Sequence, residues 1–313
     1  MKIVTLDGDT LPQPPARPNW CTDWHYHSST PAAEIVTALQ GAQIAITNKV
    51  PLRAETLTQL PDLRFICVAA TGYDCIDLAA CRERGIVVSN VPGYSTRSVA
   101  EGVIAALFAL RRHLLDYANS TRSAWPESAH FCVHRQPIQD IFGATLGIVG
   151  KGDIGSAVGE MAQALGMQVL YAERPGTSAP RAGYLPFEEV LARCDVLTLH
   201  CPLTPQTAQL INAQALAQMK PSALLINTAR GGLINESELA HALRQGVIAG
   251  AALDVLTREP PSADHPLLQA DVPNLLLTPH IAWASQQGVA NLLRGIESNL
   301  AAFAQDKAQN VVN

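Results

Sequence analysis

Residues 146–155 read LGIVGKGDIG, an apolar run that leads into three glycines at positions 150, 152 and 155. The spacing G-x-G-x-x-G is a weak signal alone, but here it follows an apolar strand and opens a helical segment, the context of a dinucleotide-binding turn. Gly150 permits the tight turn, Gly152 lets the backbone approach a pyrophosphate, and Gly155 lets the helix pack closely on the strand. The first N–H groups of that helix would bind the phosphates.

The cofactor is predicted from the end of the next strand. An acidic residue about 20 positions beyond the turn commonly holds the ribose diol of NAD, and Glu173 stands there, followed by Arg174. A carboxylate repels the 2′-phosphate of NADP, whereas Arg174 could pair with that phosphate. Because Glu173 is fixed at the strand end, we predict NAD, with NADP bound more weakly. Two alternatives stay open for the turn itself: a purely packing role, and the related turns of methyltransferases.

Short apolar segments alternate with helical ones along most of the chain. A first set of strands is predicted at 3–6, 44–47, 65–68 and 86–89. A second set is predicted at 145–149, 169–171, 196–199, 224–227, 250–253 and 275–277. Helices are predicted between them, at 32–39, 78–84, 156–165, 187–193, 212–219 and 236–245. This alternation is typical of parallel sheets covered on both faces, so we predict an α/β protein with two doubly wound parallel-sheet domains.

The two sets are separated by a long amphipathic segment at 98–117. Ser98 and Glu101 have the spacing of a capping box, which predicts that this helix begins at Ser98. Asn235 and Glu238 predict a cap for the helix at 236–245, with Gly246 at its end. Irregular chain is predicted from 118 to 140, and a final helix at 285–303.

Composition excludes several classes of protein. The 313 residues are 48% apolar and 16% charged, with a net charge of −5, which excludes a disordered chain and offers no basic face for nucleic acid. The longest apolar run, 102–110, is shorter than the about 20 residues of a membrane span, and the N-terminus reads as a strand. Seven scattered cysteines have no metal or redox spacing. We expect a soluble cytoplasmic protein with no nucleic-acid or membrane partner and no bound metal.

Polar side chains gather at the ends of three predicted strands. Arg230, Asp254 and His280 each follow such an end closely, and Glu259 comes shortly after Asp254. In a doubly wound sheet these ends meet at one rim, where ligands bind. Arginine can fork onto a carboxylate, histidine can exchange a proton near neutral pH, and a neighbouring carboxylate favours the imidazolium. Separately, each residue could be structural, for example in an Arg230–Asp254 ion pair; together they favour a catalytic site.

Other histidines are weaker candidates. His200 follows the strand at 196–199, so it is predicted either to contact the cofactor or to pack in the core, and Cys201 could equally fill space. His25 and His27 have a metal-compatible spacing, but no partner ligands are evident. We therefore assign no metal site.

Taken together, these segments resemble the D-isomer-specific 2-hydroxyacid dehydrogenases. The resemblance rests on the glycine turn and on the stretches LHCPLT at 199–204, NTARGG at 227–232, REP at 258–260 and PH at 279–280. It implies a Rossmann NAD-binding domain at 98–284, inserted in a flavodoxin-like substrate-binding domain formed by 1–97 and 285–313. It also implies a homodimer.

The resemblance further implies the roles of individual residues. Arg230, Glu259 and His280 would be catalytic. Substrate would be bound by Ala70, Thr71 and Gly72 together with Arg230 and His280. The predicted cofactor-binding residues are Gly150, Gly152, Asp153, Ile154, Gly155, Glu173, Arg174, His200, Cys201, Pro202, Thr207, Thr228, Ala229, Asp254 and Trp283. Asp153 departs from the family, which usually has arginine there, and Glu173 replaces the more usual aspartate.

Two stretches, 90–101 and 280–285, resemble the glycerate dehydrogenase (hydroxypyruvate reductase) branch. The resemblance therefore implies hydride transfer between NAD(H) and C2 of a small 2-keto or 2-hydroxy acid, with hydroxypyruvate/D-glycerate or glyoxylate as the first candidates. Phosphoglycerate or another 2-keto acid is the alternative substrate. A non-catalytic, dinucleotide-sensing interaction protein is the alternative from another class, because fold and motif do not prove turnover.

Overall fold

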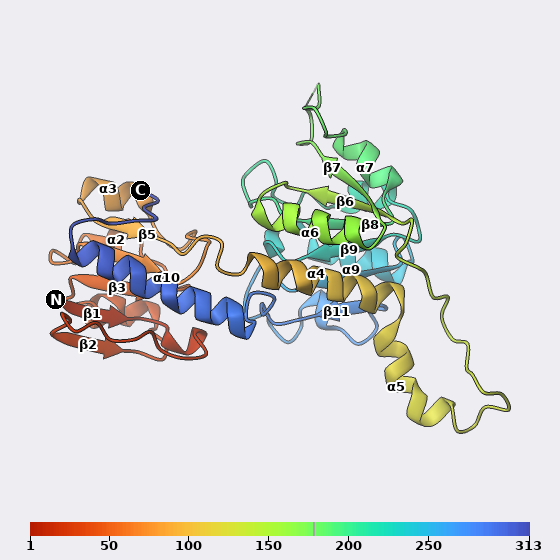
Figure 1. The fold of residues 1–313 in the computed structure, drawn as a ribbon, viewed down its shortest axis with the longest axis horizontal. Helices are drawn as coiled ribbons and strands as arrows, with labels where there is room; N and C mark the ends of the chain where they lie inside the picture. Colours follow the sequence, from red (N-terminus) through yellow and green to blue (C-terminus); the bar gives the residue numbers. More distant parts are fainter. Residues whose placement is uncertain (178) are drawn as a thin grey trace. The chain divides into compact units, whose positions relative to one another are not determined.

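The computed structural model describes residues 1–177 and 179–313 and divides the chain into two compact units. The first unit comprises Met1–Ser95 and Ala284–Asn313, and the second comprises Thr96–Trp283 (Figure 1). The second unit is thus an insertion in the first. From the sequence, the domain boundaries were predicted to follow residues 97 and 284.

The first unit contains a five-stranded parallel sheet in the order β2-β1-β3-β4-β5, which is the flavodoxin-like order. Its strands are β1 (Lys2–Thr5), β2 (Asp23–Tyr26), β3 (Ile44–Thr47), β4 (Phe65–Val68) and β5 (Val87–Ser89). The strand β2 was not predicted from the sequence. This edge strand has no buried residue, so its sequence, DWHY, lacks the apolar run by which the other strands are recognised.

Helices cover both faces of this sheet. The short helices α1 (Ile35–Ala38), α2 (Ala54–Leu57) and α3 (Leu78–Glu83) share a core with Val4 and Ile66. Neighbouring strand residues point to the opposite face, where Phe65 stacks on Phe303 of α10 (Gln286–Ala304), with ring centroids 4.4 Å apart. Single turns of 3-10 helix occur at Gly8–Thr10 and Ala32–Glu34.

The second unit contains a six-stranded parallel sheet in the order β11-β10-β9-β8-β6-β7. Its strands are β6 (Thr145–Val149), β7 (Gln168–Ala172), β8 (Val196–Leu199), β9 (Leu224–Asn227), β10 (Gly250–Leu253) and β11 (Leu275–Leu277). Beyond β7, Leu185 makes one parallel bridge to Ala172. This bridge stands where a Rossmann sheet has its third strand. The predicted pair of doubly wound sheets is confirmed.

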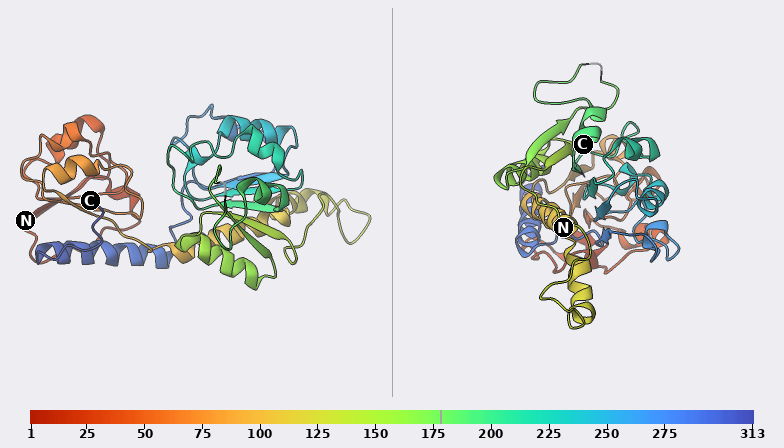
Figure 2. Two further views of the ribbon diagram at one scale, coloured as in Figure 1. Left: turned by 90° about the horizontal axis from the view of Figure 1, so that it is seen from above. Right: turned by 90° about the vertical axis from the view of Figure 1, so that its right-hand side faces the viewer.

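Helices cover both faces of this sheet (Figures 1 and 2). Leu146 and Ile148 pack with α4 (Thr96–Arg111) and α6 (Asp153–Ala164). On the other face lie α7 (Phe187–Arg193), α8 (Ala213–Gln218) and α9 (Glu236–Arg244), together with the 3-10 turns Gly231–Leu233 and Pro266–Leu268. The predicted cap of α9 is confirmed, because the Asn235 side chain accepts a hydrogen bond from the Glu238 N–H at 3.2 Å.

The predicted helix at 98–117 is wrong in three respects. The helix α4 begins at Thr96, so Ser98 lies inside its first turn rather than at the cap. It ends at Arg111, and His113, with φ +48°, separates it from α5 (Leu114–Ala124), whose residues 118–124 were predicted to be irregular. Apolar spacing continues through Leu114 and hides the break. The helix α5 itself has no buried residue, so no apolar stripe marks it.

Within the described residues, no helix combines the length and the apolar character that crossing a membrane requires.

Candidate active site

The glycine turn joins β6 to α6 in the second unit. Gly150 has φ +101°, and a Cβ there would lie 2.6 Å from the backbone nitrogen of Cys201. At Gly155 a Cβ would lie 2.0 Å from the Gly150 carbonyl oxygen, whereas at Gly152 it would meet nothing within 4 Å. Packing therefore requires glycine at 150 and 155, while the backbone at Gly152 faces open space. Gly152 stands at the N-cap of α6, and among the described residues no capping hydrogen bond from a side chain is found there, so the first N–H groups of the helix are available to an anion.

A second feature of the site is the loop that follows β9. The Thr228 hydroxyl is buried and has no hydrogen-bond partner among the described residues. Leaving such a group unpaired is costly, which favours a ligand atom beside it. The open backbone at Gly152, the uncapped helix and this hydroxyl fit a bound dinucleotide.

Buried Asn227 fixes the same loop in a way that the sequence analysis did not predict. Its side chain accepts a hydrogen bond from the Ala229 N–H at 3.0 Å and donates one to the Arg230 carbonyl at 2.9 Å. The Arg230 guanidinium donates to the Ala229 carbonyl at 2.8 Å. In the sequence, the signal that could have identified Asn227 as a positioning residue is an amide side chain at the end of the apolar run 224–227.

Gly231 brings the Arg230 loop against the segment that carries Glu259. A Cβ at Gly231 would lie 1.9 Å from the backbone carbon of Leu256. The two loops therefore pack backbone against backbone, and any side chain at 231 would force them apart.

His280 and Glu259 form the central pair of the site. The His280 Nδ1 lies 2.7 Å from Glu259 Oε2, and Glu259 Oε1 accepts a hydrogen bond from the Leu256 N–H at 2.9 Å. The two side chains are 28% and 35% exposed, so both are accessible. Because Nδ1 faces the carboxylate, Nε2 is the ring nitrogen available to exchange a proton with a substrate.

The turn that carries His280 is held by Asp254. His280 has φ +55°, an uncommon backbone conformation for a residue other than glycine. The Asp254 carboxylate, only 4% exposed, accepts hydrogen bonds from the Thr278 hydroxyl and from the N–H groups of Ile281 and Ala282, the last two at 2.9 Å. The Trp283 indole donates to the His280 carbonyl at 2.8 Å. Asp254 thus acts as a positioning residue for His280, a role that its strand-end position alone did not predict.

Glu236 and His265 form a second pair beside the loop that carries Glu259. One Glu236 oxygen accepts a hydrogen bond from the Thr257 N–H at 2.6 Å, and the other lies 3.1 Å from His265 Nε2. Both side chains are largely buried. Glu236 stands at the start of α9, where an acidic residue is ordinary, so the sequence offered no signal for it.

The predicted substrate-carboxylate loop lies in the first unit. The Thr71 hydroxyl donates to the Val91 carbonyl at 3.1 Å, and the Asn90 side chain donates to the Thr71 carbonyl at 2.7 Å. Among the described residues, no hydrogen bond uses the N–H of Thr71 or Gly72. Two adjacent N–H groups of this kind can bind an anion.

His200 and its neighbours line the glycine turn. The His200 Nε2 lies 2.9 Å from the Thr198 hydroxyl, and burial lowers the pKa of His200 to about 4, so the ring is neutral near pH 7. Burial also raises the pKa of Cys201 to about 11, which keeps its thiol protonated. The Thr207 hydroxyl donates to the Pro202 carbonyl at 2.7 Å and shapes the following loop. His200 therefore supplies packing without a positive charge.

The lowered pKa of His200 predicts a pH dependence of stability. Between about pH 6.5 and 4, His200 is protonated in the unfolded chain but stays neutral in the folded protein. The free energy of unfolding should therefore fall by roughly 1–3 kcal/mol as the pH drops through this window. Urea unfolding of the wild type and of His200→Asn at pH 4.5 and 7 measures this difference. The variant should lose less stability than the wild type; an equal loss would contradict the assignment.

The remaining predicted cofactor residues surround the end of β7 and the start of α6. Asp153 is the exposed first residue of α6, and Ile154 packs against the core beneath α4. Glu173 is 3% exposed, and hydrogen bonds from Arg181 hold the pKa of its carboxyl at about 2. Among the described residues, no group of three or more histidine, cysteine or acidic side chains could hold a metal ion.

Comparison with known proteins identifies the family. Residues 104–282 match the model described as "D-isomer specific 2-hydroxyacid dehydrogenase, NAD binding domain". The chain belongs to the D-isomer-specific 2-hydroxyacid dehydrogenases. It is similar to the glycerate dehydrogenase of Methylorubrum extorquens, at 47% identity over 99% of this chain and 98% of that protein. It is also similar to the hydroxypyruvate reductase of Blautia hydrogenotrophica, at 36% identity over the whole of both.

Among solved structures, an acyclic imino acid reductase in complex with NADPH and D-Arg superposes with a TM-score of 0.84, at 30% identity over all of both chains. Membership of the family makes this chain an NAD-dependent oxidoreductase that transfers a hydride to and from C2 of a small 2-hydroxy acid. The predictions of family, enzyme class and cofactor from the sequence are confirmed. The comparisons do not favour a non-catalytic sensor.

Proposed function

We propose that this protein is a glycerate dehydrogenase that reduces hydroxypyruvate, with Arg230, Glu259 and His280 as its catalytic residues. The observation that carries the proposal is the His280–Glu259 pair at 2.7 Å. It occurs in a chain that is 47% identical, over nearly its full length, to a protein named glycerate dehydrogenase.

The proposed roles of the residues follow from the negative charge that develops on the keto oxygen of the substrate during reduction. NAD(H), when bound at the glycine turn, supplies or accepts the hydride. As the keto carbon is reduced, negative charge grows on its oxygen, and the protonated His280 ring stabilises that charge and delivers the proton from Nε2. Glu259 stabilises the imidazolium through Nδ1, and Asp254 holds the ring in place through its turn. The Arg230 guanidinium binds the substrate carboxylate as a planar fork.

A substrate panel tests this proposal. Initial rates of NADH oxidation would be measured with hydroxypyruvate, glyoxylate, pyruvate and 3-phosphohydroxypyruvate. We expect the highest kcat/KM with hydroxypyruvate, followed by glyoxylate. A preference for the phosphorylated acid or for pyruvate would overturn the substrate assignment but leave the family intact.

Glu259→Gln should slow reduction. Glutamine can still accept a hydrogen bond from Nδ1 of His280, but it carries no negative charge to stabilise the imidazolium that donates the proton. We expect kcat for hydroxypyruvate reduction at neutral pH to fall while the Kd of NADH stays near the wild-type value. An unchanged kcat would mean that Glu259 does not support His280 in proton transfer.

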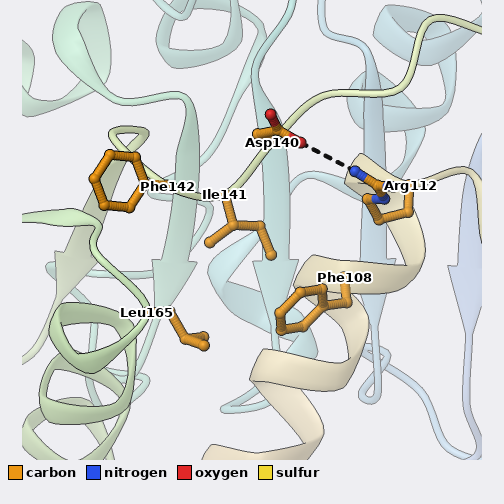
Figure 3. A pocket seen from close by; sticks show the side chains of 6 residues that line it. All are labelled: Phe108, Arg112, Asp140, Ile141, Phe142 and Leu165. Carbon is orange, nitrogen blue, oxygen red and sulfur yellow. Dashed lines mark hydrogen bonds and ion pairs between the residues drawn. The ribbon is translucent and has the colours of Figure 1, made fainter.

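We infer that the protein is a homodimer assembled through α5 and the chain that follows it. This arm extends away from the sheet of its own unit (Figures 1 and 2). It exposes large apolar side chains, with Phe131 90%, Phe142 83%, Trp125 54% and Leu115 52% exposed. Beside its base lies a hollow of about 270 Å³ lined by Phe108, Ile141, Phe142 and Leu165 and bordered by the Arg112–Asp140 ion pair (Figure 3).

A second copy of the chain would cover these apolar side chains, because exposed apolar surface on this scale commonly marks an interface. Light scattering during gel filtration should give the mass of a dimer, and Phe131→Asp should shift it toward that of a monomer. A wild-type monomer at micromolar concentration would contradict the inference.

We also infer a cytoplasmic location. All seven cysteines are free, and free thiols persist in reducing compartments. Cell fractionation would test this directly.

A further inference from the structure

After β7, the described chain brings to Glu173 an arginine, Arg181, that neither the family motif nor the proposed mechanism uses. Arg181, which is 57% exposed, binds the 3%-exposed Glu173 carboxylate through Nε at 2.6 Å and Nη2 at 2.9 Å. We propose that Arg181 is the residue that sets the discrimination between NADH and NADPH. It pairs with the Glu173 carboxylate when no cofactor is bound, gives up part of that contact to the ribose of NADH, and pairs with the 2′-phosphate when NADPH binds.

Arg181 and the backbone together occupy all the acceptor positions of the Glu173 carboxylate. Oε1 accepts hydrogen bonds from the Arg174 N–H and from Arg181 Nη2, each at 2.9 Å. Oε2 accepts from Arg181 Nε at 2.6 Å and from the Arg181 N–H at 3.2 Å. A carboxylate has about four acceptor positions, so all are in use. A ribose diol can reach Glu173 only if Arg181 gives up at least one of them.

A bare carboxylate at the end of β7 would repel a 2′-phosphate, and this is why the sequence predicts weaker binding of NADP. The Arg181 guanidinium cancels that charge, and it can move from one anion to another because its side chain is more than half exposed. Arginine also binds phosphate with the same bidentate fork that it uses for carboxylate.

A second cation lies nearby. The Arg181 guanidinium lies over the Tyr184 ring, 4.1 Å from its centroid, and the Lys151 ammonium lies 4.3 Å from the centroid of Tyr171 and 5.9 Å from that of Tyr184. Lys151 belongs to the glycine turn itself. The two tyrosine rings thus contact two cations, Arg181 and Lys151, and such aromatic contacts hold cations in position.

Arg174 plays a different part from the one that its sequence position suggests. It follows Glu173 directly, yet it contacts the Glu173 carboxylate through its backbone N–H, while the guanidinium on Glu173 comes from Arg181. The residue nearest in sequence is therefore not the one that the fold brings to the carboxylate.

The test measures cofactor affinity without substrate. Isothermal titration calorimetry would give the Kd of NADH, NADPH, ADP and 2′,5′-ADP for the wild type and for Arg181→Gln, Glu173→Gln and Arg174→Gln. Arg193→Gln is the matched control, because it removes another surface arginine that pairs with a glutamate, Glu189, in the same unit.

For Arg181→Gln we expect the Kd of NADPH and of 2′,5′-ADP to rise about tenfold, the size of a lost charge-assisted pair at an exposed site. The Kd of NADH and of ADP should stay within about threefold or fall, because Glu173 is released for the ribose. Glu173→Gln should have the opposite effect and lower the Kd of NADPH relative to that of NADH. Arg193→Gln should change none of these values.

The proposal is overturned if Arg181→Gln leaves the NADPH/NADH ratio of Kd values unchanged, or if Arg174→Gln alone reproduces the tenfold loss. It rests on the proposed function only in taking the dinucleotide to bind at the glycine turn. A failed reduction of hydroxypyruvate would sink the substrate assignment, but the calorimetric ratios would be unaffected, so the two failures are distinguishable.

Discussion

His280→Asn is expected to lower kcat for hydroxypyruvate reduction by about 10² to 10⁴-fold, the range that general acid catalysis contributes. Asparagine is chosen because it tolerates the left-handed backbone found here, φ +55°. The turn should therefore survive, since Asp254 and Trp283 hold it through backbone groups of 280–282.

The control for this variant is the Kd of NADH, which should stay within about twofold of the wild-type value. A kcat near that of the wild type, with the fold intact by circular dichroism, would contradict the role of His280 as the proton donor.

Arg230→Lys should be damaging even though the charge is kept. Lysine offers a point charge where arginine offers a planar fork, so it cannot bind a carboxylate in the same two-bonded way. We expect KM for hydroxypyruvate to rise and kcat to fall, with a combined loss in kcat/KM of at least about tenfold, or roughly 1.4 kcal/mol.

The NADH affinity of Arg230→Lys should again stay close to that of the wild type. If KM and kcat both remain within about twofold, Arg230 supports only the loop between Asn227 and Gly231, and a different group must bind the substrate carboxylate.

Much of the fold could be predicted because the parallel strands are buried on both faces. Strands such as Phe65–Val68 and Val196–Leu199 are fully buried, and they read as short continuous apolar runs. Two elements that were not predicted lie at the surface. The edge strand β2 and the helix α5 have no buried residue, so neither carries the apolar pattern on which prediction depends.

Part of the candidate site could likewise be predicted from the sequence and part could not. Glycine spacing and strand-end positions could point to Gly150, His280 and Glu259, because each follows directly from where a strand stops. The contacts that support these residues join positions that are well separated in the sequence, and a local sequence pattern does not predict them. Asp254 reaches the turn at 281–282, and Arg181 rather than Arg174 reaches Glu173.

The most direct test of the account is the stereochemistry of oxidation. Initial rates of NAD reduction would be measured with D-glycerate and L-glycerate, for the wild type and for His280→Asn. The account predicts turnover of D-glycerate alone by the wild type, and its loss in the variant by about 10²-fold or more. Turnover of L-glycerate, or equal rates with D-glycerate in the two proteins, would contradict it.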